Sequence, residues 1–231
     1  MTHEVVSVIC SGSNLTSHID RIIDNTGNYF APCVAYEKLL RTSTPDIIIY
    51  IHDDVTIHDS NWLERVIDCF DVPMYPSENT VAVGLGGATQ LGNGNLYRKP
   101  YNIMNMARYG YASNQTDAEV HGARFTGVRK VAVLDAFFMA VRRDWLLSIG
   151  GWPVRYLTHH CLDTWLACEA ARAGKEIWMV GASCTHHGGG SSTKDTYRDA
   201  KWLQGGSREL DHRLPHKWIY ENYGDVLPII I

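Results

Sequence analysis

The stretch Asp46-Ile-Ile-Ile-Tyr-Ile-His-Asp-Asp-Val55 decides the fold of this chain. Its first part, residues 46–51, is apolar on both faces, a pattern typical of a strand in the middle of a parallel sheet. The strand runs straight into His52, Asp53 and Asp54. In open α/β sheets, ligands bind beyond the carboxyl ends of the strands. We therefore expect these polar residues to lie at a binding site.

Two interpretations of the adjacent carboxylates remain open at this point. Neighbouring negative charges repel each other, and a hard divalent cation that also binds phosphate oxygens would compensate for them. Alternatively, Asp53 and Asp54 form a solvated turn that caps a helix.

The remaining elements follow from hydrophobic periodicity and from turn residues. Strands are predicted at 5–10, 19–24, 80–84, 131–141 and 176–180, and helices at 31–41, 60–70, 142–149 and 162–173. Residues 86–129 show little periodicity, as expected for a functional or disordered loop. Strands that alternate with helices predict an α/β fold with a mainly parallel sheet, and no boundary divides residues 1–231 into separate domains.

Composition excludes several classes of protein. The net charge of −4, with no run of five basic residues, argues against a nucleic-acid-binding protein. No stretch approaches the roughly 18 apolar residues that span a bilayer. The start Met-Thr-His-Glu lacks the basic region of a signal peptide, so a cytoplasmic location is expected. The six cysteines form no CxxC pair, which argues against a zinc knuckle or a disulfide framework.

A second polar cluster, residues 185–193, follows a short predicted strand and contains His186, His187 and the glycines 188–190. Imidazole binds first-row divalent metals, and glycines let the backbone approach a phosphate closely. The alternative is a histidine pair at the surface, although a merely solvated loop does not need three consecutive glycines.

A third cluster is His159-His160-Cys161-Leu162-Asp163. Asp163 falls in the first turn of a predicted helix, where the helix dipole favours a carboxylate. It is either a simple helix-start residue or a general base at the edge of the sheet.

Several segments together resemble inverting glycosyltransferase family 2, particularly its branch similar to the streptomycin-biosynthesis-type glycosyltransferases. The resemblance extends over roughly residues 5–192, and residues 193–231 are expected to form a helical or irregular extension. It is carried by Ala35-Tyr-Glu-Lys-Leu39, Ile49-Tyr-Ile-His-Asp-Asp-Val55, Val83-Gly-Leu-Gly-Gly-Ala88, Leu134-Asp-Ala-Phe-Phe-Met-Ala140, His160-x-x-Asp163, and His186 with Gly188 to Ser191.

The resemblance implies a fold of the GT-A type and an enzyme that moves a hexose from a nucleotide-sugar donor, most often a UDP-sugar, to a hydroxyl acceptor. It assigns Asp163 as the catalytic base and Asp54 as a ligand of Mn²⁺ or Mg²⁺, with His186 or His187 completing the metal site. Asp53 is expected to contact the ribose or the metal shell. Further expected contacts are Ser11, Ser13 and Asp24 for the nucleotide base, Gly188 and Gly189 for the phosphates, and Asp135, Trp152 and His160 for the acceptor or sugar.

Two other functions fit parts of the pattern. A metal-dependent nucleotide-sugar pyrophosphatase or phosphohydrolase also uses paired Asp and His ligands, and a carbohydrate-binding domain could keep the fold without catalysis. Aromatic residues in the long loop or near the third cluster can stack on sugars, although aromatics at such positions are as often in the core: Tyr97, Tyr101, Tyr109 and Trp152.

Overall fold

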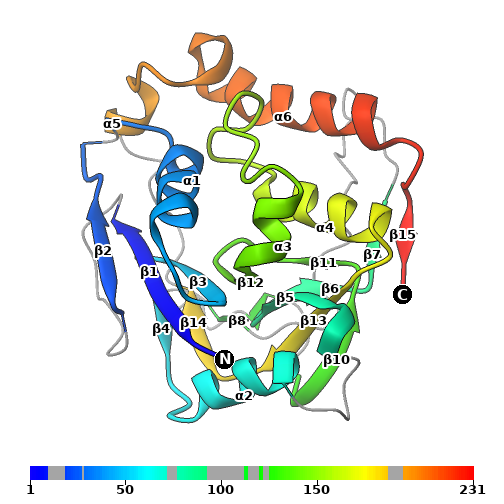
Figure 1. Ribbon diagram of the computed structural model, residues 1–231. Coiled ribbons are helices and arrows are strands. Elements are labelled where there is room, and N and C mark those ends of the chain that lie inside the picture. The colour runs from blue at the N-terminus through cyan, green and yellow to red at the C-terminus, as the bar shows by residue number, and fades with distance from the viewer. Residues whose placement is uncertain are drawn as a thin grey trace.

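A seven-stranded sheet lies at the centre of the molecule, with helices on both faces (Figure 1). The structure, a computed structural model, describes residues 1–9, 19–27, 29–71, 77–92, 112–113, 120–121, 125–186 and 195–231. Across the sheet the strands are ordered β10 (Gly127–Val131), β13 (Glu176–Gly181), β5 (Thr80–Gly84), β12 (Phe138–Arg142), β3 (Ile47–His52), β1 (His3–Ile9) and β2 (Arg21–Asp24). The predicted α/β class is confirmed.

The sheet is mixed, where the sequence predicted a mainly parallel one. Strands β2, β1 and β3 run parallel to one another, as do β5 and β13. Strand β12 pairs antiparallel with both β3 and β5, and β10 pairs antiparallel with β13. Strand β12 is entered from β11 through the turn at residues 135–137, so it is not preceded by the helix that the expected strand–helix alternation places before a parallel strand.

Most predicted elements are present with shifted ends, and one is wrong. Residues 131–141, predicted as one strand, form β11 (Val133–Leu134) and β12, separated by a turn at residues 135–137. The amide of Asp135 donates to the carbonyl of Gly86 at 2.9 Å, and β11 pairs with β6 (Gly87–Ala88) in a separate two-stranded sheet. This turn brings Asp135 to the edge where β3 ends.

The helices divide between the two faces of the sheet (Figure 1). α1 (Pro32–Thr42), α3 (Arg143–Ser148) and α4 (Leu162–Arg172) cover one face and share a core that includes Leu39, Leu146 and Leu166. α2 (Trp62–Asp71) covers the other face and packs on Val5, Ile49 and Phe138 through its own apolar side. This double coverage explains why residues 47–51 are all buried.

Three short pairings surround the end of β3. β4 (Val55–Ile57) and β14 (Cys184–His186) pair antiparallel, and β14 also pairs with β8 (Ala112–Ser113), which pairs with β9 (Val120–His121). A 3-10 turn, η1 (Ser77–Asn79), precedes β5. The pairing of β14 with β4 brings His186, from the second polar cluster, next to the first cluster.

Residues 195–231 form defined elements that cross the α4 side of the molecule. They are α5 (Asp195–Arg198), the 3-10 turn η3 (Gln204–Gly206), α6 (Arg208–Tyr223) and β15 (Ile229–Ile230). α6 lies above α4, and β15 returns to pair antiparallel with β7 (Gln90–Leu91) (Figure 1). Within the described residues, no helix has both the length and the apolar character needed to cross a membrane.

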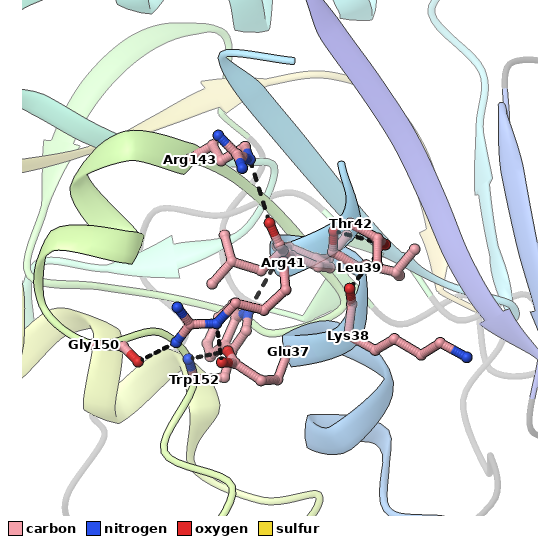
Figure 2. Close-up of polar contacts among 10 residues, drawn as sticks. Glu37, Lys38, Leu39, Arg41, Thr42, Arg143, Gly150 and Trp152 are labelled. Carbon is pink, nitrogen blue, oxygen red and sulfur yellow. Dashed lines mark hydrogen bonds and ion pairs between the residues drawn. The ribbon is translucent and has the colours of Figure 1, made fainter. Parts of the chain in front are cut away.

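A polar clamp ties α1 to the turn that follows α3 (Figure 2). The Glu37 carboxylate accepts from the Arg41 Nε at 2.7 Å and from the backbone amide of Trp152, also at 2.7 Å. Arg41 in turn donates to the carbonyl of Gly150. The clamp fixes the start of the segment that leads to the third polar cluster.

Candidate active site

The turn between β3 and β4 carries the two carboxylates of the first cluster. Both are buried, with exposed fractions of 5% for Asp53 and 8% for Asp54, so the interpretation as a solvated turn is wrong. The amide of His52 donates to the carbonyl of Phe137 at 2.9 Å, which fixes the end of β3 beside the turn at 135–137. A buried pair of carboxylates needs positive partners nearby.

His186 supplies one such partner. In the β14–β4 pairing it lies opposite Val55, and its Nε2 is 3.2 Å from Oδ1 of Asp54. The Nδ1 of His52 lies 4.0 Å from the same oxygen. Ligand atoms of His52, Asp54 and His186 all lie within 4.8 Å of one another, which makes a possible metal site in the described part of the chain.

The ionisable groups of this cluster shift one another's pKa. Burial alone raises the pKa of Asp54, but the hydrogen bond and charge of His186 outweigh it, so the pKa of Asp54 lies below its usual value. Burial lowers the pKa of His186, but the same bond to Asp54 and its charge hold it above its usual value. Burial and the nearby His186 lower the pKa of His52. One imidazole is thus paired with the carboxylate, and the other is kept neutral.

An aromatic ring packs against one histidine of the cluster. Phe137, which is fully buried, stacks on His186 with ring centroids 5.2 Å apart and an angle of 28° between the planes. A Cβ on Gly86 would lie 2.7 Å from the Phe137 ring. A glycine is therefore required there if the ring is to stay against His186.

Asp135 and Asp163 bring the third cluster to the same place. The charge of Asp135 acts on His52, His186 and Asp163, and the backbone of the next residue, Ala136, donates a hydrogen bond to Asp163, so the turn at 135–137 is close to both the metal-ligand cluster and the start of α4. Asp163 is 9% exposed, and its Oδ1 accepts from the amide of Thr164 at 2.7 Å. Burial first, and then the charge of Asp135, raise the pKa of Asp163 to about 6. Such a value suits a general base at neutral pH.

Two histidines precede Asp163 in the chain. His159 and His160 stack on each other with centroids 4.8 Å apart. Burial lowers the pKa of His159 to about 4, with the charge of His52 adding to the effect, so this ring is neutral. Among the described residues, its Nδ1 is buried and has no hydrogen-bond partner. After His160 the chain turns through Cys161, whose φ of 65° lies in the left-handed region, before α4 begins.

The sequence placed His52 near the binding site, and the structure adds it to the possible metal ligands. Its position at the end of a strand gave it the appearance of a strand residue, and only the pairing of β14 with β4 shows that it faces His186. His159 is a similar case, since nothing in a pair of adjacent histidines shows which ring has an enclosed nitrogen.

The remaining predicted contacts fall in three groups. Asp24 ends β2 at the surface, and hydrogen bonds from the amide and hydroxyl of Thr26 hold the pKa of Asp24 below its usual value. Trp152 is 2% exposed, and Tyr36, Tyr50 and Trp165 surround its ring, so the expectation that it stacks on a sugar has no support in this fold. The others lie outside the described residues: Ser11, Ser13, Tyr97, Tyr101, Tyr109, His187, Gly188 and Gly189.

Comparison with known proteins gives both sequence and structural likenesses. A family model described as "Glycosyltransferase like family" matches residues 23–204. No curated protein matches the chain in sequence. The fold is similar to the crystal structure of GalNAc-T7 with UDP, GalNAc and Mn²⁺, with a TM-score of 0.52 and 9% identity over 80% of this chain and 43% of that one.

A second similar structure is the mannosyltransferase PcManGT from Pyrobaculum calidifontis in complex with GDP-Man and Mn²⁺. Its TM-score is 0.50, with 13% identity over 83% of this chain and 59% of that one. The chain thus spans less than two thirds of either protein. At these identities the likeness shows a shared GT-A fold.

Proposed function

The chain belongs to the glycosyltransferase-like family, and from this premise we propose that it transfers a hexose from a nucleotide-sugar donor to a hydroxyl group of an acceptor. We propose further that the reaction depends on a divalent metal ion and inverts the anomeric carbon. The observation that carries the proposal is one juxtaposition: the turn at 135–137 contacts both His52, of the cluster of two imidazoles and a carboxylate, and Asp163.

The metal-ligand cluster fits a first-row divalent ion. Two imidazoles and one carboxylate suit Mn²⁺, whereas Mg²⁺ is held mainly by oxygen atoms. Without an ion, the proton on His186 compensates the charge of buried Asp54. To bind an ion, His186 would release that proton, because imidazole ligates a metal only in its neutral form, and the ion would then be the positive partner of Asp54. When bound, the ion would neutralise charge that develops on the diphosphate leaving group. His52, Asp54 and His186 would hold it, and Asp53 at the same turn would contact the ribose or the metal shell.

Asp163 is the proposed general base. A pKa of about 6 leaves the carboxylate mostly ionised at neutral pH but basic enough to take the proton of an attacking hydroxyl. Attack from the face opposite the leaving group gives inversion in a single displacement, through an oxocarbenium-like transition state of the kind known for glycosidases. Asp135 and His160 are proposed to contact the acceptor or the transferred sugar.

The proposed donor is a UDP-hexose. The support is the family resemblance, together with the position of Asp24 at the carboxyl end of β2, in the parallel part of the sheet that also contains β3. Of the two similar structures, GalNAc-T7 is a complex with UDP, and PcManGT is a complex with GDP-Man. A guanosine nucleotide is therefore the alternative donor to include in any test.

The experiment measures binding and products separately. We expect calorimetry to show UDP binding that strengthens with Mn²⁺ and weakens when EDTA is present. An Asp54→Ala variant should lose the metal-dependent part, whereas Asp68→Ala, the same change on the exposed side of α2, should keep it.

Product analysis then separates the three candidate functions. Incubation with UDP-hexoses and GDP-mannose, with and without saccharide acceptors, should give a new glycoside only when acceptor is present. Nucleoside monophosphate and sugar phosphate as products would indicate a pyrophosphatase instead. Saccharide binding without turnover of any donor would indicate a carbohydrate-binding domain.

A further inference from the structure

A buried carboxylate on α6 organises the segment that precedes Asp163. Asp211 is completely buried. Its Oδ1 accepts from the hydroxyl of Thr158 at 2.6 Å and from the amide of Gln204 at 2.9 Å, and its Oδ2 accepts from the hydroxyl of Tyr197 at 2.8 Å. The two oxygens therefore have different partners: Oδ1 holds two chain segments together, and Oδ2 holds one phenol.

That phenol is also in contact with His160. The oxygen of Tyr197 lies 3.0 Å from the Nε2 of His160. A phenolic hydroxyl has a single proton, and here the proton points to Asp211. The Tyr197 oxygen can therefore only accept from His160. It follows that the Nε2 of His160 carries a hydrogen, and that in the neutral ring the unprotonated nitrogen is Nδ1.

Neighbouring contacts restrict the position of the same ring. His159 stacks on one side of His160, and Tyr197 meets His159 edge-on with centroids 5.3 Å apart. Beyond the histidine pair, Nδ1 of His216 lies 3.3 Å from the sulfur of Cys161. α6 thus contacts the chain just before and just after the two histidines, through Thr158 and Cys161.

We infer that Asp211 and Tyr197 are positioning residues, which set the tautomer and the orientation of His160 in the acceptor part of the site. The inference rests on the proposed function, in which His160 contacts the acceptor or sugar. The family model ends at residue 204, so Asp211 lies outside the matched region. Selection of one tautomer decides whether Nδ1 of His160 is a donor or an acceptor, and the orientation of the ring decides how His160 is presented to the acceptor.

The tautomer can be measured without any substrate. Nitrogen NMR of ¹⁵N-histidine-labelled protein distinguishes protonated from unprotonated ring nitrogens, and His160→Gln identifies the signals of His160 among the eleven histidines. We expect Nε2 to be protonated and Nδ1 unprotonated in the neutral ring of the full chain. The opposite tautomer would overturn the inference, whatever reaction the protein catalyses.

Asp211→Asn gives the sharpest variant. Because Oδ1 keeps its two donors, the amide nitrogen takes the place of Oδ2 and donates to the Tyr197 oxygen. The hydroxyl proton must then turn to His160, and the tautomer should reverse to Nδ1–H. Tyr197→Phe removes the acceptor that faces Nε2 and should weaken the preference for the Nε2–H tautomer. An unchanged tautomer in both variants would contradict the inference.

Kinetics connect the tautomer to the reaction. For Asp211→Asn and Tyr197→Phe we expect kcat/KM for the acceptor to fall about 10- to 100-fold, the range that small misplacement of a site group produces. The KM for the donor should stay within about twofold, as expected if only the acceptor side is disturbed.

Thr158→Val is the matched control. It also removes a hydrogen bond to Asp211, but it leaves the contact between Tyr197 and His160. It should lower the melting temperature without changing the tautomer or the acceptor kinetics. Equal kinetic losses in all three variants would reduce the network to a structural role and overturn the inference. A wild type that transfers no sugar would instead refute the proposed function, and the tautomer measurement would still decide the inference.

Discussion

At the scale of single residues, the ionised form of Asp163 lowers the stability of the folded state. Its pKa rises from an ordinary 3.8 to about 6, because burial and the charge of Asp135 both disfavour ionisation. The folded state therefore binds the proton more tightly than the unfolded state does. The contribution of protonated Asp163 to the free energy of unfolding is complete below about pH 4 and is lost as the pH rises through about 6. The ionised carboxylate therefore destabilises the protein at neutral pH.

Asp163→Asn should consequently separate activity from stability. Without the proton acceptor, transfer should fall by about 10²- to 10⁴-fold, and the decline of wild-type kcat below about pH 6 should disappear. Donor affinity should stay within a few-fold. At pH 8 the variant should be more stable by up to about 3 kcal/mol, and the gain should shrink at pH 5. Turnover and urea unfolding at both pH values measure this.

Other roles of Asp163 predict other outcomes for the same variant. A simple helix-start residue would leave turnover near normal, because Asn is equally suited to that position. A metal ligand would lose donor binding and turnover together. Near-normal turnover would refute the assignment of Asp163 as the base.

Asp54→Ala should affect stability as well as binding. An exposed turn carboxylate would be replaced with little effect, but Asp54 is buried and paired with His186. The pair is complete between the lowered pKa of Asp54 and the raised pKa of His186, so its contribution is lost toward acid as Asp54 protonates and toward alkaline pH as His186 loses its proton. We expect a loss of about 1–3 kcal/mol near pH 6. Thermal unfolding across pH, with Asp68→Ala as the control, checks this; a flat difference would contradict it.

Some candidate site residues could be recognised from the sequence because they lie at the end of a predicted strand or at the start of a predicted helix. Asp54 and Asp163 could be named as candidates because Asp54 follows a buried strand and Asp163 lies in the first turn of a helix; their roles remain predictions. The burial of Asp54 was not predictable, since it depends on the pairing of β4 with β14, which lies far along the chain. The core position of Trp152 was hidden for the same reason: tertiary neighbours, not local sequence, enclose its ring.

At the scale of elements, the turn after α3 depends on two glycines with different surroundings. Gly150 and Gly151 have φ values of 105° and 86°, which side chains rarely adopt. A Cβ on Gly150 would have no atom within 4 Å, whereas one on Gly151 would lie 2.5 Å from Oε2 of Glu37. Glu37 is the centre of the clamp shown in Figure 2.

The two alanine variants should therefore differ in stability. Gly150→Ala has only backbone strain to overcome, about 1–3 kcal/mol. Gly151→Ala has similar strain and also displaces Glu37 from Arg41 and from the amide of Trp152, so its free energy of unfolding should be lower by at least a further 1 kcal/mol or so. In a Glu37→Ala background this extra difference should largely vanish. Urea denaturation of both variants in both backgrounds is the measurement, and persistence of the difference would disprove the clamp.

Elements were predicted well where periodicity was strong and poorly where tertiary contacts decide the backbone. α4 matched its predicted range closely because its apolar residues recur at helical spacing. The turn at 135–137 interrupts a run of apolar residues that resembles one strand, and only its hydrogen bond to Gly86 reveals it. α6 is mostly polar and contains Pro215, so its sequence indicates a helix only weakly.

At the scale of the whole molecule, residues 195–231 belong to the core rather than to an appendage. Ile219 and Tyr223 of α6 are buried, and the Tyr223 hydroxyl accepts from the Trp165 indole at 2.9 Å. The sequence offered no match for this part, and the family model also ends before α6. The seven-stranded order and the mixed directions were likewise not predictable, because pairings between distant strands leave no local signal.

Truncation should show whether residues 195–231 are needed for the stability of the folded core. Removal of residues after 204 deletes Asp211 and exposes the indole of Trp165, so we expect loss of cooperative unfolding or a large drop in melting temperature. Removal of residues after 227 deletes only the pairing of β15 with β7 and should leave a cooperatively folded protein of lower stability. Circular dichroism melts of both truncations test this; an unchanged melt for the shorter chain would show that α6 is dispensable.

The long separations along the chain also set an order of events during synthesis. Thr158 leaves the ribosome well before its partner Asp211, because the two are 53 positions apart. At about 5–20 residues per second, this gap corresponds to roughly 3 to 10 s of translation. During that interval the nascent chain already has β3 and its carboxylates, but Asp211 does not yet hold the segment that carries the histidine pair. Under the proposed function, the acceptor side is therefore the last part of the candidate site to mature, and a ribosome stalled within α6 would carry a site that is half assembled.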